Sequence, residues 1–150
     1  MKKVFLAMAA LFQLSTAFAQ DKSGLLTHYY EVKDALVSGN SNAAATAATA
    51  LITAAGNSTD KAVQASKDKL VADAQQIASG KDLAQQREQF KQLSADMYTL
   101  AKTTKLSEQP VYQQYCPMKK ASWLSSSNAI KNPYFGSQML TCGKVADTIQ

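Results

Sequence analysis

The stretch LLTHYYEVKDAL, residues 25–36, decides the fold class of this chain. Its large apolar side chains Leu25, Tyr29, Val32 and Leu36 recur at spacings of four and three, with mostly polar residues between them. Such spacing places side chains along one face of an α-helix, which turns once every ~3.6 residues. The stretch therefore predicts an amphipathic helix that packs against other elements.

Three more helices are expected after this one. Residues 43–55 are rich in alanine, the best helix former. Residues 63–77 and 83–100 carry apolar side chains at helical spacing. Four amphipathic helices joined by short turns predict an all-α fold, an antiparallel four-helix bundle over residues 23–104.

The turns carry the residue types that begin and end helices. Gly39 and Asn40 separate the first two helices, and Asp82 is expected to cap the fourth. Ser23 is expected to cap the first helix, and Ser58 or Thr59 the third.

The N-terminus has the pattern of an export signal. Lys2 and Lys3 precede an uncharged apolar run over residues 4–14, and Ala17 to Ala19 fits a small-x-small cleavage site. The apolar run is too short for a transmembrane helix. We therefore expect a signal peptide over residues 1–19 and a single mature domain over residues 20–150, with no membrane span, in the periplasm or secreted.

Charge and motifs exclude several function classes. The net charge of +5 falls to +3 once Lys2 and Lys3 are removed, and the chain has a single arginine. This is not the basic footprint of a nucleic-acid-binding protein. The only histidine is His28, and no CxxC, HExxH or glycine-rich phosphate loop occurs. The sequence therefore favours a protein that is not an enzyme.

The C-terminal segment, residues 110–150, differs from everything before it. It holds both cysteines, the only tryptophan and a turn sequence around Pro133 and Gly136. Residues 111–116 and 123–125 are expected to be extended, and a short helical turn is expected from Ser137. We predict an irregular segment, with a possible short hairpin and short helix, folded back onto the bundle.

The sulfur atoms of this segment allow a metal site, a disulfide or redox-active thiols, and the absence of CxxC disfavours the last. Cys116 and Met118 form one soft-ligand pair and Met139 and Cys142 another, a set that would select Cu(I), with His28 as a possible fifth ligand. Alternatively, the two cysteines form a disulfide, as cysteines of exported domains usually do. Closing this loop of 26 positions would contribute ~3.5 kcal/mol by the chain-entropy estimate.

The aromatic residues of the segment pose a similar choice. Large aromatic side chains are most often buried, so Trp123, Tyr134 and Phe135 are expected to form a small core. If exposed together, the three would form a surface for a partner protein.

Three parts of the sequence resemble one bacterial family. They are residues 30–37 (YEVKDALV), residues 86–94 (QREQFKQLS) and the pattern from Tyr112 through Cys116, Trp123 and Asn132-Pro133-Tyr134-Phe135-Gly136 to Val145. The family is labelled domain of unknown function 3347. Its members are small exported helical proteins, and similar domains are fused to adaptor subunits of heavy-metal efflux pumps.

The resemblance implies a periplasmic helical domain involved in handling copper or a related metal. Carried over by position, the implied ligands are Cys116, Met118, Met139 and Cys142. We therefore expect a non-enzymatic metal-binding or efflux accessory domain, with a possible efflux-pump or envelope protein as its partner. The alternative is a disulfide-stapled interaction module of the cell envelope that holds no metal.

Overall fold

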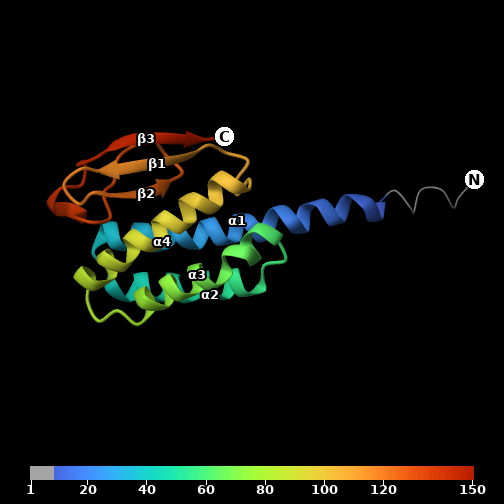
Figure 1. Cartoon of the computed structure of the whole chain (residues 1–150), viewed down its shortest axis with the longest axis horizontal. Helices are drawn as coiled ribbons and strands as arrows, with labels where there is room; N and C mark the ends of the chain where they lie inside the picture. Colours follow the sequence, from blue (N-terminus) through green and yellow to red (C-terminus); the bar gives the residue numbers. More distant parts are fainter. Residues whose placement is uncertain (1–8) are drawn as a thin grey trace, which may run out of the picture.

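The structure is a computed structural model that describes residues 9–150, with side chains for residue 22 and residues 24–150. Four helices are followed by a small sheet (Figure 1). In chain order the elements are α1 (Ala9–Ser38), α2 (Ser41–Asn57), α3 (Lys61–Ala78), α4 (Leu83–Thr103), β1 (Val111–Cys116), β2 (Ala121–Ser125), the 3₁₀ helix η1 (Gly136–Gln138) and β3 (Lys144–Ile149).

The helices pack in chain order, α1 on α2, α2 on α3 and α3 on α4. Their predicted apolar stripes form the core: Leu25, Tyr29, Val32 and Leu36 of α1 are all completely buried. Helix α2 contributes mainly small side chains and a buried Leu51. Alanine lets two helix backbones approach closely, so α2 packs against both α1 and α3.

Asparagine and aspartate side chains cap three of the helices. Asn40 accepts a hydrogen bond from the N–H of Ala43 at 2.9 Å, and Asp82 caps α4 as predicted. The predicted cap of α3 is wrong, because Asp60 takes this role instead of Ser58 or Thr59. Its carboxylate accepts hydrogen bonds from two backbone N–H groups. It also lies at the N-terminus of the helix, where a negative charge is stabilising.

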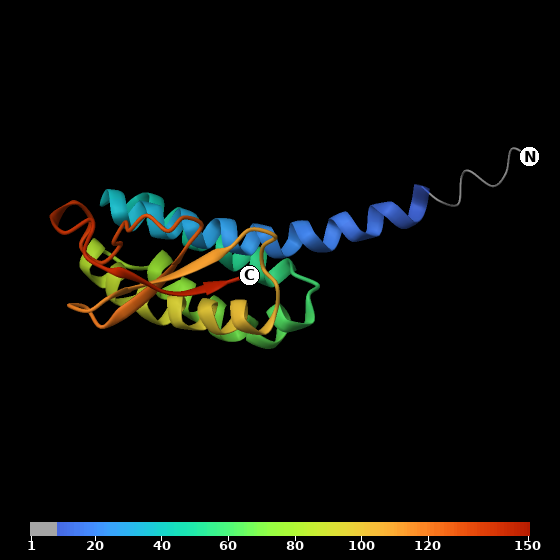
Figure 2. The ribbon, with the colours of Figure 1, turned by 90° about the horizontal axis from the view of Figure 1, so that it is seen from above.

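Helix α1 begins earlier than predicted. It runs without a break from Ala9 through Ser23 to Ser38, so Ser23 lies inside the helix and does not cap it. The residues before Ser23 include several alanines and leucines, which favour helix when the chain continues upstream. The N-terminal part of α1 extends beyond the other elements (Figure 2). Residues 1–8 lie outside the described part, and removal of residues 1–19 stays a prediction.

The all-α prediction is wrong for the C-terminal segment. Strands β1 and β2 form the expected hairpin, but β3 adds a third strand, giving an antiparallel sheet of order β2-β1-β3. The short helix is η1, which begins at Gly136, not at Ser137. None of the residues of β3 is buried, so this strand has no apolar pattern that would predict it.

The sheet forms a layer over α1 and α4, with α2 and α3 on the far side of those helices (Figure 1). Strand β2 contacts α4 and α1. The N–H of Leu124 donates to the hydroxyl of Tyr29 at 2.9 Å, and this hydroxyl also bonds to Ser94 of α4 at 2.7 Å. At the opposite edge, Asp147 of β3 accepts from Tyr98 and Lys102 of α4. Side chains therefore attach both edges of the sheet to the helices.

Candidate functional site

The structure brings the two cysteines together at one end of the sheet. Cys116 is the last residue of β1, and Cys142 lies shortly before β3. The strands pair Tyr115 with Lys144, so the residues just beyond this pair are neighbours. Both thiols are free, and each shifts the pKa of the other.

The turn that joins β1 to β2 surrounds the Cys116 sulfur with donors. The backbone N–H groups of Lys119 and Met118, the side chain of Asn132 and the Cys142 thiol each favour its ionised form. Burial alone would raise the pKa of Cys116, but these donors outweigh burial and lower it. Cys116 is therefore the cysteine that is easier to ionise.

Cys142 is half-buried and has the opposite tendency. Its pKa is raised by burial, by its hydrogen bond to Cys116 and by the charge that Cys116 carries when ionised. The pair thus favours one thiolate beside one thiol, in which the thiol donates to the thiolate.

Asn132 organises the segment that carries Cys142. It is completely buried, and its amide donates to the backbone carbonyl of Cys142 at 2.7 Å. Its side-chain oxygen accepts the N–H of Tyr134 at 2.8 Å, and its own N–H donates to Leu140 at 2.8 Å. One buried side chain therefore fixes both the turn at residues 132–136 and the position of Cys142.

Arg87 of α4 attaches this segment to the helices. Its Nε donates to the carbonyl of Pro133 and its Nη2 to the carbonyl of Leu36, both at 2.9 Å. Gly136 packs against the same place with φ of +58°, and an added Cβ would lie 2.7 Å from Arg87 Nη2 and 2.9 Å from the oxygen of Val37. Only glycine fits this backbone approach.

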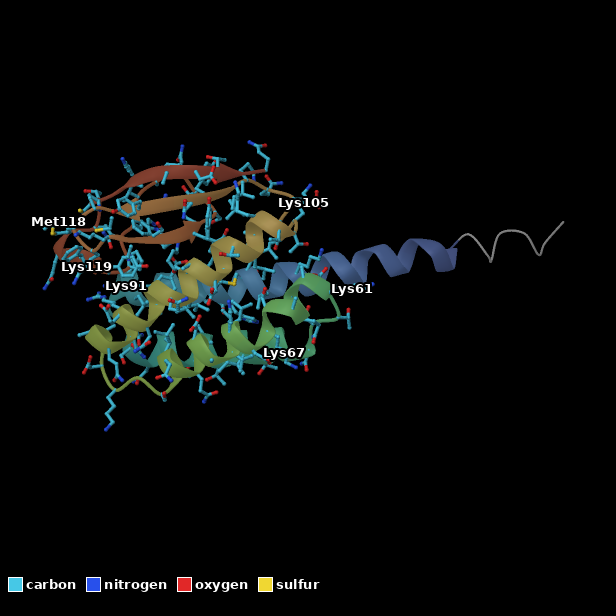
Figure 3. The ribbon with its side chains drawn as sticks, viewed as in Figure 1. Lys61, Lys67, Lys91, Lys105, Met118 and Lys119 are labelled. Atoms are coloured by element: carbon cyan, nitrogen blue, oxygen red, sulfur yellow. The ribbon has the colours of Figure 1, made fainter. Side chains whose placement is uncertain are left out.

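The two methionines lie at exposed positions of the same end. Met118 follows Cys116 by two residues and is 64% exposed, and Met139 follows η1 and is 36% exposed. Figure 3 shows Met118 and its neighbour Lys119 at the tip of the hairpin. The backbone of Met118 lies near the Cys116 thiol, while its side-chain thioether is exposed to solvent.

His28 does not join the sulfur residues. Its Nδ1 lies 2.8 Å from Oε2 of Glu31, one turn further along α1. In the described part of the chain, no three His, Cys, Asp or Glu side chains gather closely enough to hold a metal ion. The structure does not bring His28 together with both cysteines, and its role as a metal ligand stays a prediction.

The three aromatic residues do not form a common surface. Trp123 is completely buried and Tyr134 is 3% exposed, and their rings meet edge to face at 6.0 Å. Tyr134 also contacts Phe90 of α4. Only Phe135 is partly exposed, with Lys119 over its ring. Trp123 and Tyr134 belong to the core between sheet and helices, so neither can form the alternative partner surface.

Asn132 and Arg87 were not identified as organising residues from the sequence. Two signals pointed to them: Arg87 is the only arginine, and Asn132 directly precedes a proline in a turn. Neither signal shows the partners, because the carbonyls that Arg87 binds lie 46 and 51 positions away in the sequence.

Fold and site together define a small, mainly helical domain with a C-terminal three-stranded sheet that carries a dithiol. Residues 25–109 match the family described as "Protein of unknown function (DUF3347)". The chain belongs to this family, as the resemblance predicted. The match covers the four helices from Leu25 of α1 onward and ends before β1, so the dithiol lies outside the matched residues.

No curated protein and no solved structure matches the chain significantly. Within the described part of the chain, no helix combines the length and the apolarity that crossing a membrane requires.

Proposed function

We propose that the Cys116–Cys142 dithiol binds Cu(I) and that the protein is a non-enzymatic accessory domain for copper or heavy-metal handling in the periplasm. The observation that carries this proposal is the pairing of two free thiols at one end of the sheet, with Cys116 buried and Cys142 half-buried. The turn that follows Cys116 lowers its pKa and so favours its thiolate. Thiolates are the ligands that soft Cu(I) prefers, and this pair fits it.

The donor set argues against other metals. Structural zinc needs four nitrogen, sulfur or oxygen ligands, and calcium or magnesium needs several oxygens. In the part of the chain that the structure describes, no cluster of three such side chains exists. Cu(I) is satisfied by fewer, softer ligands, so two thiolates with one thioether from Met118 or Met139 are an adequate set.

In this proposal the helices, as an antiparallel four-helix bundle, are the scaffold and the sheet carries the ligands. The exposed Met118 at the hairpin tip gives an incoming ion or a partner protein its first contact. An efflux-pump or other envelope protein is the expected partner, since a domain of this size without enzymatic groups would deliver or receive the metal.

An anaerobic competition titration tests the proposal. The purified, reduced protein should withdraw Cu(I) from a chromogenic chelator, and the double variant Cys116→Ser/Cys142→Ser should not. His28→Gln is the matched control and should compete like the wild type, because His28 is paired with Glu31. Met118→Leu and Met139→Leu, tested singly, identify the thioether. If the double variant competes as well as the wild type, the dithiol is not the metal site.

The second candidate function is a disulfide clasp, which the same thiol contact favours. Oxidation would join Cys116 to Cys142, tie the end of β1 to the segment before β3 and remove both ligands. The domain would then be a stapled interaction module of the cell envelope. Intact-mass measurement of protein recovered from the cell envelope distinguishes the two: a quantitative loss of two protons supports the clasp, and full thiol content with bound copper supports the metal site.

A further inference from the structure

A cavity lies on the helix side of the hairpin tip, near the dithiol. It has a volume of about 320 Å³ and opens between α4 and the segment that contains Phe135. Arg87, Glu88 and Lys91 line it from α4, and Lys119 lines it from the β1–β2 turn. Figure 3 shows Lys91 and Lys119 at the same end of the molecule. Ligand sites typically begin at ~300 Å³, so this cavity suits a small molecule.

The cavity has more positive charge than its own carboxylate neutralises. Glu88 is bound by Lys91 at 2.8 Å. The Nε and Nη2 groups of Arg87 donate to backbone carbonyls, and burial lowers its pKa. In the described part of the chain, no ion pair involves Arg87 or Lys119. Two cationic groups thus face the cavity without an acidic partner.

Aromatic side chains also line the cavity, and one of the two cations lies against an aromatic ring. Phe135 is half-buried, and the Lys119 ammonium lies 5.0 Å from the centre of its ring. The hydroxyl of Tyr134 is bonded to the carbonyl of Ser122, which leaves the apolar part of this side chain for the cavity. A flat apolar group in the cavity could therefore pack on the Phe135 ring. Lys119 and Arg87 line the same cavity.

We propose that this cavity binds a small carboxylate with a flat, single-ring apolar body. The carboxylate pairs with Arg87 and Lys119, and the ring packs on Phe135. Arginine is suited to this role because its guanidinium stays protonated. Its Nε and Nη2 already donate to backbone carbonyls, so it acts here as a fixed positive charge and not as a bidentate fork. The site is separate from the dithiol, and its occupation does not depend on copper.

Benzoate is the probe for this proposal, and benzamide is its neutral isostere. Benzoate should produce saturable shifts in the backbone amide resonances of Phe135 and Gln138, which line the cavity, and benzamide should bind several-fold more weakly. Lys119→Gln should weaken benzoate about threefold, the scale of one exposed ion pair. Phe135→Leu should weaken it while leaving the charges in place.

Lys61→Gln is the matched control. It removes the same charge at the other end of the molecule (Figure 3) and should leave benzoate binding unchanged. Equal binding of benzoate and benzamide would overturn the role of the charges. Inorganic phosphate that binds as tightly as benzoate, with no effect of Phe135→Leu, would reduce the site to a bare cationic patch. An absence of shifts at Phe135 and Gln138 would exclude the site altogether.

Discussion

The helical part, residues 22–103, and the C-terminal segment, residues 110–150, are held together by different interactions. The helices bury apolar stripes, and three of them are capped by side chains within three residues of the groups they bind. The C-terminal segment depends on polar contacts across long sequence separations, such as Tyr29 with Leu124 and Arg87 with Pro133. Local information therefore specifies the first region, while distant partners specify the second.

The largest loss of stability is expected at Trp123, where the C-terminal segment packs as an ordinary apolar core. Trp123→Ala removes a completely buried side chain and should lower the free energy of unfolding by about 3–5 kcal/mol. Met118→Ala, in the same hairpin but 64% exposed, should change it little. Chemical denaturation measures both. Equal effects of the two substitutions would mean that the sheet is not packed on the helices.

Asn132→Ala tests the polar contacts within the segment. It would leave the N–H of Tyr134 and the carbonyl of Cys142 without their partners. Each unsatisfied buried group costs about 1–3 kcal/mol, so a loss of about 2–4 kcal/mol is expected from denaturation. Asn128→Ala, exposed in the preceding loop, is the control and should be neutral. A small effect at both positions would contradict the organising role of Asn132.

Tyr29→Phe tests the contact between the two regions. Loss of the hydroxyl leaves the buried N–H of Leu124 and the hydroxyl of Ser94 without this partner, and a cost of about 1–3 kcal/mol is expected. The neighbouring Tyr30 is a matched control, because its buried hydroxyl has no hydrogen-bond partner among the described residues. Tyr30→Phe should be neutral or stabilising. Thermal denaturation measures both variants. A larger loss of stability in Tyr30→Phe than in Tyr29→Phe would contradict the role of the Tyr29 hydroxyl.

The smallest change in stability is expected at Asp73 of α3, and it depends on pH. Burial, together with the hydrogen bond and charge of Asp96, raises the pKa of Asp73 to about 7, which Lys69 partly opposes. The unfolded value is ~3.9, so the folded state binds this proton more tightly. The contribution is therefore complete below about pH 4 and is lost as the pH rises through 7.

Asp73→Asn should remove this loss of stability between pH 5 and pH 8. The side chain is half-exposed, so about 1 kcal/mol or less is expected. Asp68→Asn, exposed on the same helix, is the control. Thermal melting at both pH values measures the difference. An unchanged pH dependence in Asp73→Asn would show that the carboxyl pair does not share a proton.

The sequence predicts the helices well because their signals are local. The predicted fourth helix and its Asp82 cap agree with α4, and the two extended pieces agree with β1 and β2. Strand β3 was not predicted, because it pairs only with β1 and buries none of its side chains.

The candidate site could be predicted only in part. The sequence identifies Cys116 and Cys142 as its reactive groups but leaves their relation open. Their proximity follows from the pairing of β1 with β3, and the lowered pKa of Cys116 owes much to turn N–H groups that almost any residue type supplies. The proximity of the two cysteines and the pKa of Cys116 both depend on how the backbone folds, which a pattern of residue types does not predict.

Strand β3 has a consequence for the kinetics of the thiol pair. It is an edge strand with four exposed and two half-buried residues, and Asp147 attaches it to α4. Edge strands of this kind open locally at a free energy below that of global unfolding, and their amides exchange hydrogen early. Since Cys142 lies just before β3, each opening would release Cys142 from Cys116. Whatever joins the two sulfurs, a metal ion or a bond, should therefore slow hydrogen exchange over residues 144–149 while leaving α2 and α3 unchanged.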